Sequence, residues 1–416
     1  MKSASIHNTR GPRVAVVTST YSRSQDDHQV PWMREMARRT VSSLQSLKVY
    51  AATFRGLGDH KIDGIEVHRF RYATAALETL THDSGAPNKA RSLGYKLLVI
   101  PYLLSGVFSI FRWCIKDKTE VLHVHWPFPH GFWALLPKWF LGVRVVAMCH
   151  GAELALARNN RIICKILSFL LRQADEVCVN SSHTAAEVKR LCGVESRVVP
   201  YGATVPEIPE NTHAEIREVP LLLFCGRLVQ RKGIDVLLRA LPQVLAKQDV
   251  EVVITGEGDR KAEWEALSAE LGLTGKVRFA GFVSNAELSE LYRTCTMYVH
   301  PAIFDDKGDT EGLGVVLIEA LANRKPVVAS GVGGIVDVII HEETGLLVPE
   351  KDEAALAAAI QRIIENPALA ARLGEEGARH AARAFDWERC AKLTLEVYRG
   401  EVPEFSELPA SSELAA

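Results

Sequence analysis

The sequence predicts an α/β protein made of two doubly wound, Rossmann-like domains. Short apolar runs of the kind found in buried strands alternate with helical segments along the 416-residue chain, as expected for parallel sheets with helices on both faces. The alternation stops at residues 202–211, where two prolines and several polar residues indicate a linker, and begins again at Pro220. We therefore expect two domains of similar size. Because ligands of open α/β sheets bind at the carboxyl ends of strands, the expected ligand site is an interdomain cleft.

The strands of the first half are predicted from continuous or alternating apolar residues. They are expected at residues 13–19, 48–54, 64–71, 120–126, 143–149, 176–180 and 197–200. Helices are expected at residues 32–46, 97–111 and 161–172, and a further one after the capping residues 181–184. Residues 73–92 are polar and irregular, which indicates an exposed loop.

The second half repeats the same pattern. Strands are expected at residues 221–225, 250–255, 276–279, 297–300 and 326–330. Helices are expected at residues 236–246, 261–270, 287–295, 315–322, 353–365 and 367–383. The last residues, 402–416, are rich in Pro, Ser, Glu and Ala and are predicted to be disordered.

The composition argues against several classes of protein. Hydrophobic residues make up 47% of the chain and charged residues 24%, and a formal net charge of −1 offers no basic field to nucleic acid. The eight cysteines form no C-x-x-C pair, which favours buried thiols in a reducing cytoplasm over disulfides or zinc ligands. Met1–Ile6 lacks the apolar core of a signal peptide, so a cytoplasmic protein is expected.

The longest apolar run, Leu97–Phe111, contains Pro101 and Gly106 and is closed by Lys96 and Arg112. It is shorter than a bilayer crossing requires. A helix of the core or the domain surface is expected, and a face that touches a membrane is the alternative.

A glycine-rich loop at Glu311–Gly314 leads into the helix expected from Val315. The unpaired N–H groups at such a helix start favour an anion, typically a phosphate. Glu311 and Glu319 are eight residues apart, a little over two helical turns, and share roughly one helix face. Because carboxylates repel an anion, these two are expected to accept hydrogen bonds from hydroxyl groups of a sugar or ribose. The alternative is a surface helix with two solvated glutamates.

Glycines also end three strands of the second half. Gly226 is followed by Arg227 and Lys232, which could bind a diphosphate, although they could also be two solvated cations. Gly256-Glu257-Gly258 and Gly281-Phe282-Val283 follow the next two strands. Their backbone could hydrogen-bond the edge of a base, or they could be plain tight turns.

Histidines mark the strand ends of the first half. His150 could donate to a sugar hydroxyl or a phosphate or move a proton, or it could be structural. His123 and His125 share a strand face, but because no acidic or cysteine partner lies at a suitable spacing, a metal site is not expected. Trp126 follows them in a loop expected to line the cleft.

The order of these motifs over roughly 130 residues resembles the retaining family-4 glycosyltransferases, whose GT-B fold consists of two facing Rossmann-like domains. The segments that carry the resemblance are Gly226-Arg227 with Lys232, 256–258, 281–283, 311–319, 325–330, Gly333-Gly334 and 344–349. The first half matches more loosely, through residues 123–126 and His150-Gly151. Residues 385–388 resemble the segment where the last helix of the family crosses back to the first domain.

The resemblance implies a role for each residue. Arg227 and Lys232 would hold the diphosphate of a nucleotide sugar, and Gly226, Gly256 and Glu257 would lie on the nucleotide side. Val283 would lie by the base, Glu319 would bind the ribose, and Glu311 would contact hydroxyls of the donor sugar. Gly312, Leu313, Gly314 and Val315 would present N–H groups to sugar and phosphate, and His150 would lie near the transferred sugar. The catalytic set so implied is Arg227, Lys232, Glu311 and His150.

The resemblance also implies the organisation and the reaction. Residues 1–205 would bind the acceptor, 206–385 the nucleotide sugar, 386–401 would form the crossing helix, and 402–416 a tail. The enzyme would need no metal and no cofactor beyond a UDP- or GDP-sugar co-substrate. It would transfer the sugar, with retained anomeric configuration, to a hydroxyl of a saccharide, a lipid-linked molecule or a small molecule. Peripheral contact with the inner face of a membrane is compatible with such an acceptor.

One departure from the family concerns residues 19–31, because this loop lacks the paired glycines that many members carry there. Its Arg23, Asp26 and Asp27 are therefore candidates for acceptor contacts. A GT-B nucleotide-sugar epimerase and a non-catalytic nucleotide-sugar-binding protein are the alternative functions. An NAD oxidoreductase is disfavoured because no G-x-G-x-x-G follows the first strand.

Overall fold

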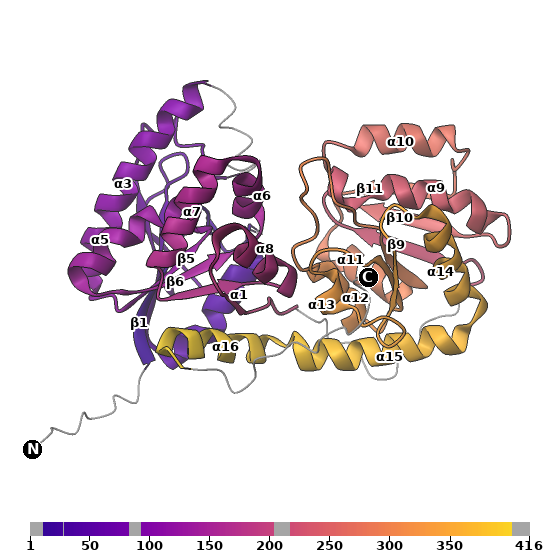
Figure 1. Ribbon diagram of the computed structural model, residues 1–416. Coiled ribbons are helices and arrows are strands. Elements are labelled where there is room, and N and C mark those ends of the chain that lie inside the picture. Colours follow the sequence, from indigo (N-terminus) through magenta and orange to yellow (C-terminus); the bar gives the residue numbers. More distant parts are fainter. Residues whose placement is uncertain (1–10, 28, 83–92, 204–216, 402–416) are drawn as a thin grey trace, which may run out of the picture. The chain divides into compact units, whose positions relative to one another are not determined.

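The computed structural model describes residues 11–27, 29–82, 93–203 and 217–401 (Figure 1). Most of the predicted linker and the whole predicted tail lie outside these residues. The chain forms two compact units. The first unit comprises the chain up to Asn180, Thr184–Val199 and the C-terminal helix that begins at Trp387. The second unit comprises Ser181–His183 and Pro200–Asp386.

The first unit is built on an eight-stranded sheet in the order β3-β4-β2-β1-β5-β6-β7-β8. Neighbouring strands run parallel except for β3, which is antiparallel to β4. The strands are β1 (Gly11–Thr18), β2 (Leu44–Ala52), β3 (His60–Ile62), β4 (Ile65–Phe70), β5 (Val121–His125), β6 (Arg144–Cys149), β7 (Glu176–Val179) and β8 (Arg197–Val198).

The helices of the first unit cover both faces of this sheet. They are α1 (Pro31–Thr40), α3 (Leu93–Asp117), α4 (Pro127–His130), α5 (Phe132–Leu141), α6 (Ala152–Asn159), α7 (Arg161–Gln173), α8 (Ser182–Cys192) and α16 (Trp387–Arg399). From β1 to β2 the chain moves toward the β3 edge of the sheet. From β4 through β5 and β6 to β7 it moves toward the β8 edge. Since parallel crossovers are right-handed, α3, α5 and α7 lie on the face opposite α1. Helix α16 packs against α1 and β1.

The second unit has a six-stranded sheet, all parallel, in the order β11-β10-β9-β12-β13-β14. The strands are β9 (Leu221–Cys225), β10 (Glu251–Thr255), β11 (Val277–Gly281), β12 (Met297–His300), β13 (Val327–Ser330) and β14 (Leu346–Val348). The helices are α9 (Ile234–Leu245), α10 (Lys261–Glu270), α11 (Asn285–Thr294), α12 (Val315–Ala322), α13 (Ile335–Val338), α14 (Glu353–Glu365) and α15 (Pro367–Ala384). The strand order reverses between β9 and β12, and such a reversal is where open α/β sheets commonly bind a ligand.

The predicted strands and helices are largely observed, with differences that have local causes. The helix expected at residues 32–46 ends at Thr40, whose Oγ1 hydrogen-bonds the Met36 carbonyl at 2.8 Å, and β2 begins at Leu44. Strand β3 was missed, although Asp63-Gly64, with φ values of 51° and 79°, is a favoured two-residue hairpin turn. Helix α5 was missed because Pro137 lies within it.

Candidate functional site

Three titratable side chains meet at the point in the second unit where the strand order reverses. Lys232 lies in the loop between β9 and α9, His300 is the last residue of β12, and Glu311 lies in the loop that follows β12. The ammonium group of Lys232 forms an ion pair with Glu311 Oε2. His300 Nε2 lies 3.5 Å from Lys232 Nζ and 3.3 Å from the same carboxylate oxygen. The fold thus brings together residues 79 positions apart in the chain.

This cluster is almost removed from solvent, since 7% of Lys232 and none of His300 is exposed. Burial would raise the pKa of the Glu311 carboxyl, but the charge of Lys232 and the hydrogen bond from His300 hold that pKa well below its ordinary value. Burial and the neighbouring Lys232 lower the pKa of His300 to about 4. At neutral pH the cluster therefore contains an ionised carboxylate and an uncharged imidazole.

Arg231 adds a second cation to the cluster. Its guanidinium lies 3.6 Å from Glu311 Oε2 and 3.4 Å from Asp309. Its carbonyl accepts a hydrogen bond of 2.9 Å from Ile303 N, which ties the loop after β9 to the loop after β12. Arg231, His300 and Asp309 were not among the predicted site residues. His300 had a usable signal, because a histidine at the carboxyl end of a strand beside the switch point is well placed to meet a ligand.

The backbone of Glu311 is fixed by the tight turn at Gly333-Gly334. Gly334 N donates a hydrogen bond of 2.9 Å to the Glu311 carbonyl. A β-carbon on Gly334 would lie 2.1 Å from the Gly312 carbonyl oxygen, so only glycine permits this approach. The two glycines therefore position the acidic loop.

Helix α12 begins beside Glu311 with an open N-terminus. Its N-cap, Gly314, has φ 87°, and no side chain caps the helix. The first turn contains no acidic residue. The N–H groups of Val315 and Val316 lie in this first turn, where no intrahelical acceptor exists for them, so they can bind an anion.

Glu319 lies one turn further along α12, where it accepts a hydrogen bond of 3.1 Å from the Tyr292 hydroxyl. Burial raises the pKa of the Glu319 carboxyl, and the hydrogen bond from Tyr292 partly offsets that rise. Glu319 and Glu311 thus have different environments, since among the described residues Glu311 pairs with a cation and Glu319 does not.

The other predicted residues of this unit lie on neighbouring strand ends. Arg227 is exposed, and the described residues offer its side chain no ion pair. Glu257 pairs with Lys261 at 2.8 Å. Gly256 N donates a hydrogen bond of 2.7 Å to the carbonyl of Gly281, which brings the turns after β10 and β11 together. Val283 follows in the second of these turns and is half-buried.

In the first unit, His150 belongs to an aromatic cluster at the ends of β5 and β6. Its Nε2 lies 2.9 Å from His125 Nδ1, and the two rings stack with centroids 5.1 Å apart. Trp126 and Trp32 lie 4.7 and 5.0 Å from the His150 ring. Burial and the neighbouring His123 lower the pKa of His150 to about 3, so this imidazole is uncharged at neutral pH. His150 and Trp126 are therefore brought together as hydrogen-bonding and stacking groups.

His123, which shares this strand face, hydrogen-bonds Tyr398 of α16 at 2.8 Å. That bond anchors the C-terminal helix to the first sheet. Within the described residues, no group of three or more His, Cys, Asp or Glu side chains could hold a metal ion.

Of the four predicted acceptor residues, Arg23, Asp26, Asp27 and Trp126, the two loop residues Arg23 and Asp27 bind each other. Arg23 Nε lies 2.7 Å from Asp27 Oδ2, and Asp27 also accepts from the backbone of Arg23 and Gln29. Although burial opposes it, these hydrogen bonds lower the pKa of Asp27 to about 2. Asp27 therefore acts as a brace of this loop, whereas Asp26 is exposed.

Acid should destabilise the first unit through its buried histidines. Burial lowers the pKa of His123 and His150 to about 3 and of His130 to about 4. The unfolded chain takes up protons below pH 6.5 that the folded unit does not, so stability falls as the pH falls from 6.5 toward 4. Each such histidine should lower the free energy of unfolding at pH 5 by about 2 kcal/mol relative to pH 7.

Urea unfolding at pH 7 and pH 5 checks this expectation. Six of the seven tryptophans lie in the first unit, so intrinsic fluorescence reports mainly on it. Between pH 7 and pH 5, the free energy of unfolding of His123→Gln should fall by about 2 kcal/mol less than that of the wild-type protein. An equal loss in both proteins would contradict the assignment.

Comparison with known proteins defines the class. A family model described as Glycosyl transferases group 1 matches residues 209–380, and one described as Glycosyltransferase Family 4 matches residues 63–205. The phosphatidyl-myo-inositol mannosyltransferase of Mycobacterium leprae is 30% identical over 380 residues, which cover 86% of this chain and 96% of that protein. The chain therefore belongs to the group 1 glycosyltransferases, and it is an enzyme of that family.

Solved structures give the same fold. Sucrose-phosphate synthase from Thermosynechococcus elongatus superimposes with a TM-score of 0.74 at 23% identity, covering 93% of this chain and 98% of that one. The Anabaena protein HepE, solved in complex with UDP and glucose, superimposes with a TM-score of 0.69 at 17% identity, covering 93% and 99%. The two Rossmann-like domains thus have the GT-B fold expected from the sequence.

Proposed function

We propose that the enzyme transfers a sugar from a nucleoside-diphosphate sugar, UDP- or GDP-linked, to an acceptor hydroxyl with retention of anomeric configuration. The observation that carries this proposal is the buried Lys232–Glu311–His300 cluster beside the open N-terminus of α12. The cluster combines a cation for phosphate, a carboxylate for hydroxyls and free backbone N–H groups within one loop system. The family-4 resemblance and the HepE complex with UDP and glucose support it.

In this proposal the diphosphate binds to the N-terminus of α12, with Lys232 and Arg227 as its cationic partners. Gly312 to Val315 contribute backbone N–H groups. Arg231, which the sequence did not single out, adds charge to the same side. Because the ionised Glu311 repels phosphate, it binds hydroxyls of the donor sugar instead. Glu319 accepts from the ribose hydroxyls, and Gly226, Gly256, Glu257 and Val283 lie on the nucleotide side.

The proposed transfer uses the leaving diphosphate as the base. The bond from the anomeric carbon to the diphosphate oxygen breaks, the acceptor oxygen bonds to that carbon from the same face, and its proton passes to the diphosphate. Negative charge grows on the diphosphate during this step, and Lys232 and Arg227 stabilise it from a largely desolvated site. These cations supply charge where other transferases use a metal ion, so no metal or other cofactor is proposed.

The first unit is proposed to supply the acceptor-side contacts. The uncharged His150 can donate one hydrogen bond to a sugar hydroxyl, and Trp126 offers an aromatic face to a saccharide ring. Of the loop candidates, the exposed Asp26 is the one whose carboxylate is available to an acceptor, since Arg23 and Asp27 pair with each other. The acceptor is a hydroxyl on a saccharide, a lipid-linked molecule or a small molecule. A cytoplasmic location is proposed because all eight cysteines are free thiols.

A thermal-unfolding screen with nucleotide sugars tests the donor assignment, since a ligand of the native state raises its apparent stability. One UDP- or GDP-sugar should raise the unfolding temperature, and the free nucleoside diphosphate should do so to a smaller extent. No shift with any nucleotide sugar would contradict the proposal. Conversion of the nucleotide sugar to an isomer without any acceptor would instead indicate an epimerase.

Glu319→Ala should weaken the binding of the free nucleoside diphosphate about tenfold or more, because a carboxylate that accepts from hydroxyls contributes about 1.5–3 kcal/mol. Titration calorimetry with the nucleoside diphosphate measures this. Tyr292→Phe is the matched control, because it removes the protein partner of Glu319 and keeps the carboxylate. Unchanged affinity in Glu319→Ala would remove the ribose assignment.

A further inference from the structure

The first unit carries an apolar outer surface on three neighbouring helices. Thirteen large hydrophobic side chains are exposed in the described part of the chain, and ten of them lie on α3, α5 and α7. They are Leu97, Ile100, Leu104, Phe108 and Ile115 of α3, Trp139, Phe140 and Leu141 of α5, and Ile162 and Phe169 of α7. We call these ten residues the apolar face. Their concentration on three helices is far from the scattered single exposures of an ordinary surface.

The three helices form a continuous layer. The Phe111 ring of α3 lies 6.4 Å from the Phe140 ring of α5, and a β-carbon on Gly106 would lie 2.3 Å from Trp133 of α5. Trp139 of α5 donates a hydrogen bond of 3.2 Å to Gln173 of α7. Figure 1 shows α3, α5 and α7 on the same side of the first sheet, as the right-handed crossovers require. The apolar face is therefore one surface.

The charge of this layer is strongly positive. The three helices contain seven basic residues, Lys96, Arg112, Lys116, Lys138, Arg161, Lys165 and Arg172, and one acidic residue, Asp117. Asp117 turns inward, where it binds Lys48 and Tyr50 at 2.8 Å each. The whole chain, by contrast, has 49 basic and 50 acidic residues. Lys138 forms an ion pair of 2.6 Å with Asp175, whereas the other six basic residues form no ion pair within the described residues. Unpaired basic residues are thus gathered on the helices that expose the apolar side chains.

Helix α3 lies on the unit and does not cross a bilayer, although Tyr95–Asp117 is long and apolar enough to span one and is 22% buried over its most apolar window. Tyr102, Ile110 and Cys114 of this helix are buried in the core of the first unit. The helix also connects β4 and β5 of a single sheet, and one crossing would place these strands on opposite sides of the membrane.

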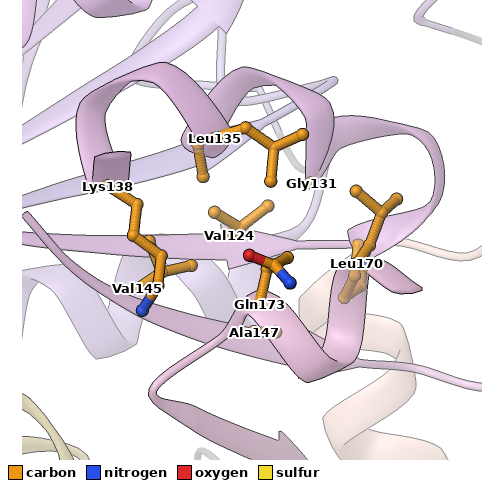
Figure 2. Close-up of a pocket in the computed structure, with 10 residues that line it drawn as sticks. Val124, Gly131, Leu135, Lys138, Val145, Ala147, Leu170 and Gln173 are labelled. Carbon is orange, nitrogen blue, oxygen red and sulfur yellow. The ribbon is translucent and has the colours of Figure 1, made fainter. Parts of the chain in front are cut away.

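A small cavity lies beneath part of this layer. Figure 2 shows a cavity between α5, α7 and strands β5 and β6, with Val124, Leu135 and Leu170 around it. Its volume is about 10 Å³, which is room for one water molecule and not for an acyl chain. This cavity therefore cannot hold an acyl chain, and the proposal below concerns the outer surface of the layer.

We propose that the apolar face docks on the surface of a bilayer with anionic headgroups. Its aromatic and aliphatic side chains enter the headgroup boundary, and the surrounding lysines and arginines bind the anionic phosphates. A large apolar surface with a basic border and almost no acid fits this occupant better than a protein partner, whose interface would be less uniformly charged. The inference is independent of the donor assignment. If both hold, the acceptor is a molecule presented at the membrane.

Sedimentation with lipid vesicles tests the proposal. The full-length protein should pellet with vesicles of phosphatidylcholine and phosphatidylglycerol, bind phosphatidylcholine alone more weakly, and dissociate as salt is raised. The double variant Phe108→Glu/Phe140→Glu should lower the partition coefficient at least about tenfold. Both side chains are about 70% exposed, at 68% and 71%, so folding and donor-induced thermal stabilisation should be retained.

Leu77→Glu is the matched control, because Leu77 is 51% exposed in the first unit but outside the three helices. Its vesicle binding should equal that of the wild-type protein. The proposal fails if the wild-type protein does not bind anionic vesicles, or if the double variant binds them equally well. It also fails if sedimentation velocity shows a dimer that the double variant dissociates while vesicles are not bound, since the face would then join two copies of this chain.

Discussion

Lys232→Ala should lower kcat/KM about 100-fold or more, because it removes the buried cation proposed to stabilise the leaving diphosphate. The structure adds a second consequence that the sequence alone did not suggest. Lys232 is the partner of the ionised Glu311, so its loss leaves a buried carboxylate whose remaining partners in the described part of the chain are Arg231 and His300. Breaking such a pair costs about 3–5 kcal/mol. Activity and stability should therefore fall together in this variant.

Arg227→Ala separates the two effects. Arg227 is exposed, and its side chain has no ion pair within the described residues, so its loss should lower turnover without lowering the unfolding temperature. Steady-state kinetics and thermal unfolding of the two variants provide the comparison. Wild-type turnover in both variants would contradict the proposal that Lys232 and Arg227 bind the diphosphate. A lower unfolding temperature in Arg227→Ala but not in Lys232→Ala would contradict the described geometry.

Glu311→Gln should distinguish sugar binding from phosphate binding. The amide keeps the shape of the side chain but removes the negative charge, which Lys232 stabilises in the wild-type protein and which neutralises Lys232 in turn. The free nucleoside diphosphate should bind as tightly as before or more tightly, because a repulsive carboxylate is gone. The kcat/KM for the nucleotide sugar should fall about tenfold to 100-fold, because hydroxyl groups lose a charged acceptor.

Asp309→Asn is the matched control for Glu311→Gln. It removes a second carboxylate of the loop after β12, one that lies 3.4 Å from Arg231, whereas the ion pair of Lys232 is with Glu311. Its sugar turnover should stay close to that of the wild-type protein. If Glu311→Gln weakens the binding of the nucleoside diphosphate as much as the binding of the nucleotide sugar, Glu311 does not have the proposed role.

Much of the fold could be predicted because its signals are local. Uninterrupted apolar runs marked most of the strands, but the order of the strands in each sheet was not predicted, because it depends on tertiary pairing. Helix α5 was missed because Pro137 hides its periodicity. The length of α3, which runs from Leu93 to Asp117, exceeded the predicted apolar run because flanking residues extend the helix without being strongly apolar.

The site was predicted in part. What could not be predicted is how side chains from different loops pair with one another in the folded chain. Lys232 and Glu311 were each found from their own loops, but their pairing depends on the approach of two loops that the sequence does not show. Arg231 was missed because no motif marks it, and His300 was missed although its place at the end of a strand was a usable signal. Both residues matter because they face Glu311. Conversely, Arg23 and Asp27 looked available in the sequence, whereas a four-residue turn pairs them with each other.

The central claim is that a nucleotide sugar binds at the Lys232–Glu311 cluster of the second unit. Titration calorimetry of the wild-type protein and Lys232→Met with the nucleotide sugar found in the thermal screen tests it most directly. The account predicts one bound nucleotide sugar per chain in the wild-type protein and an affinity at least about tenfold weaker in Lys232→Met, since a charged hydrogen bond contributes about 1.5–3 kcal/mol. Equal affinity in a folded Lys232→Met protein would contradict the account.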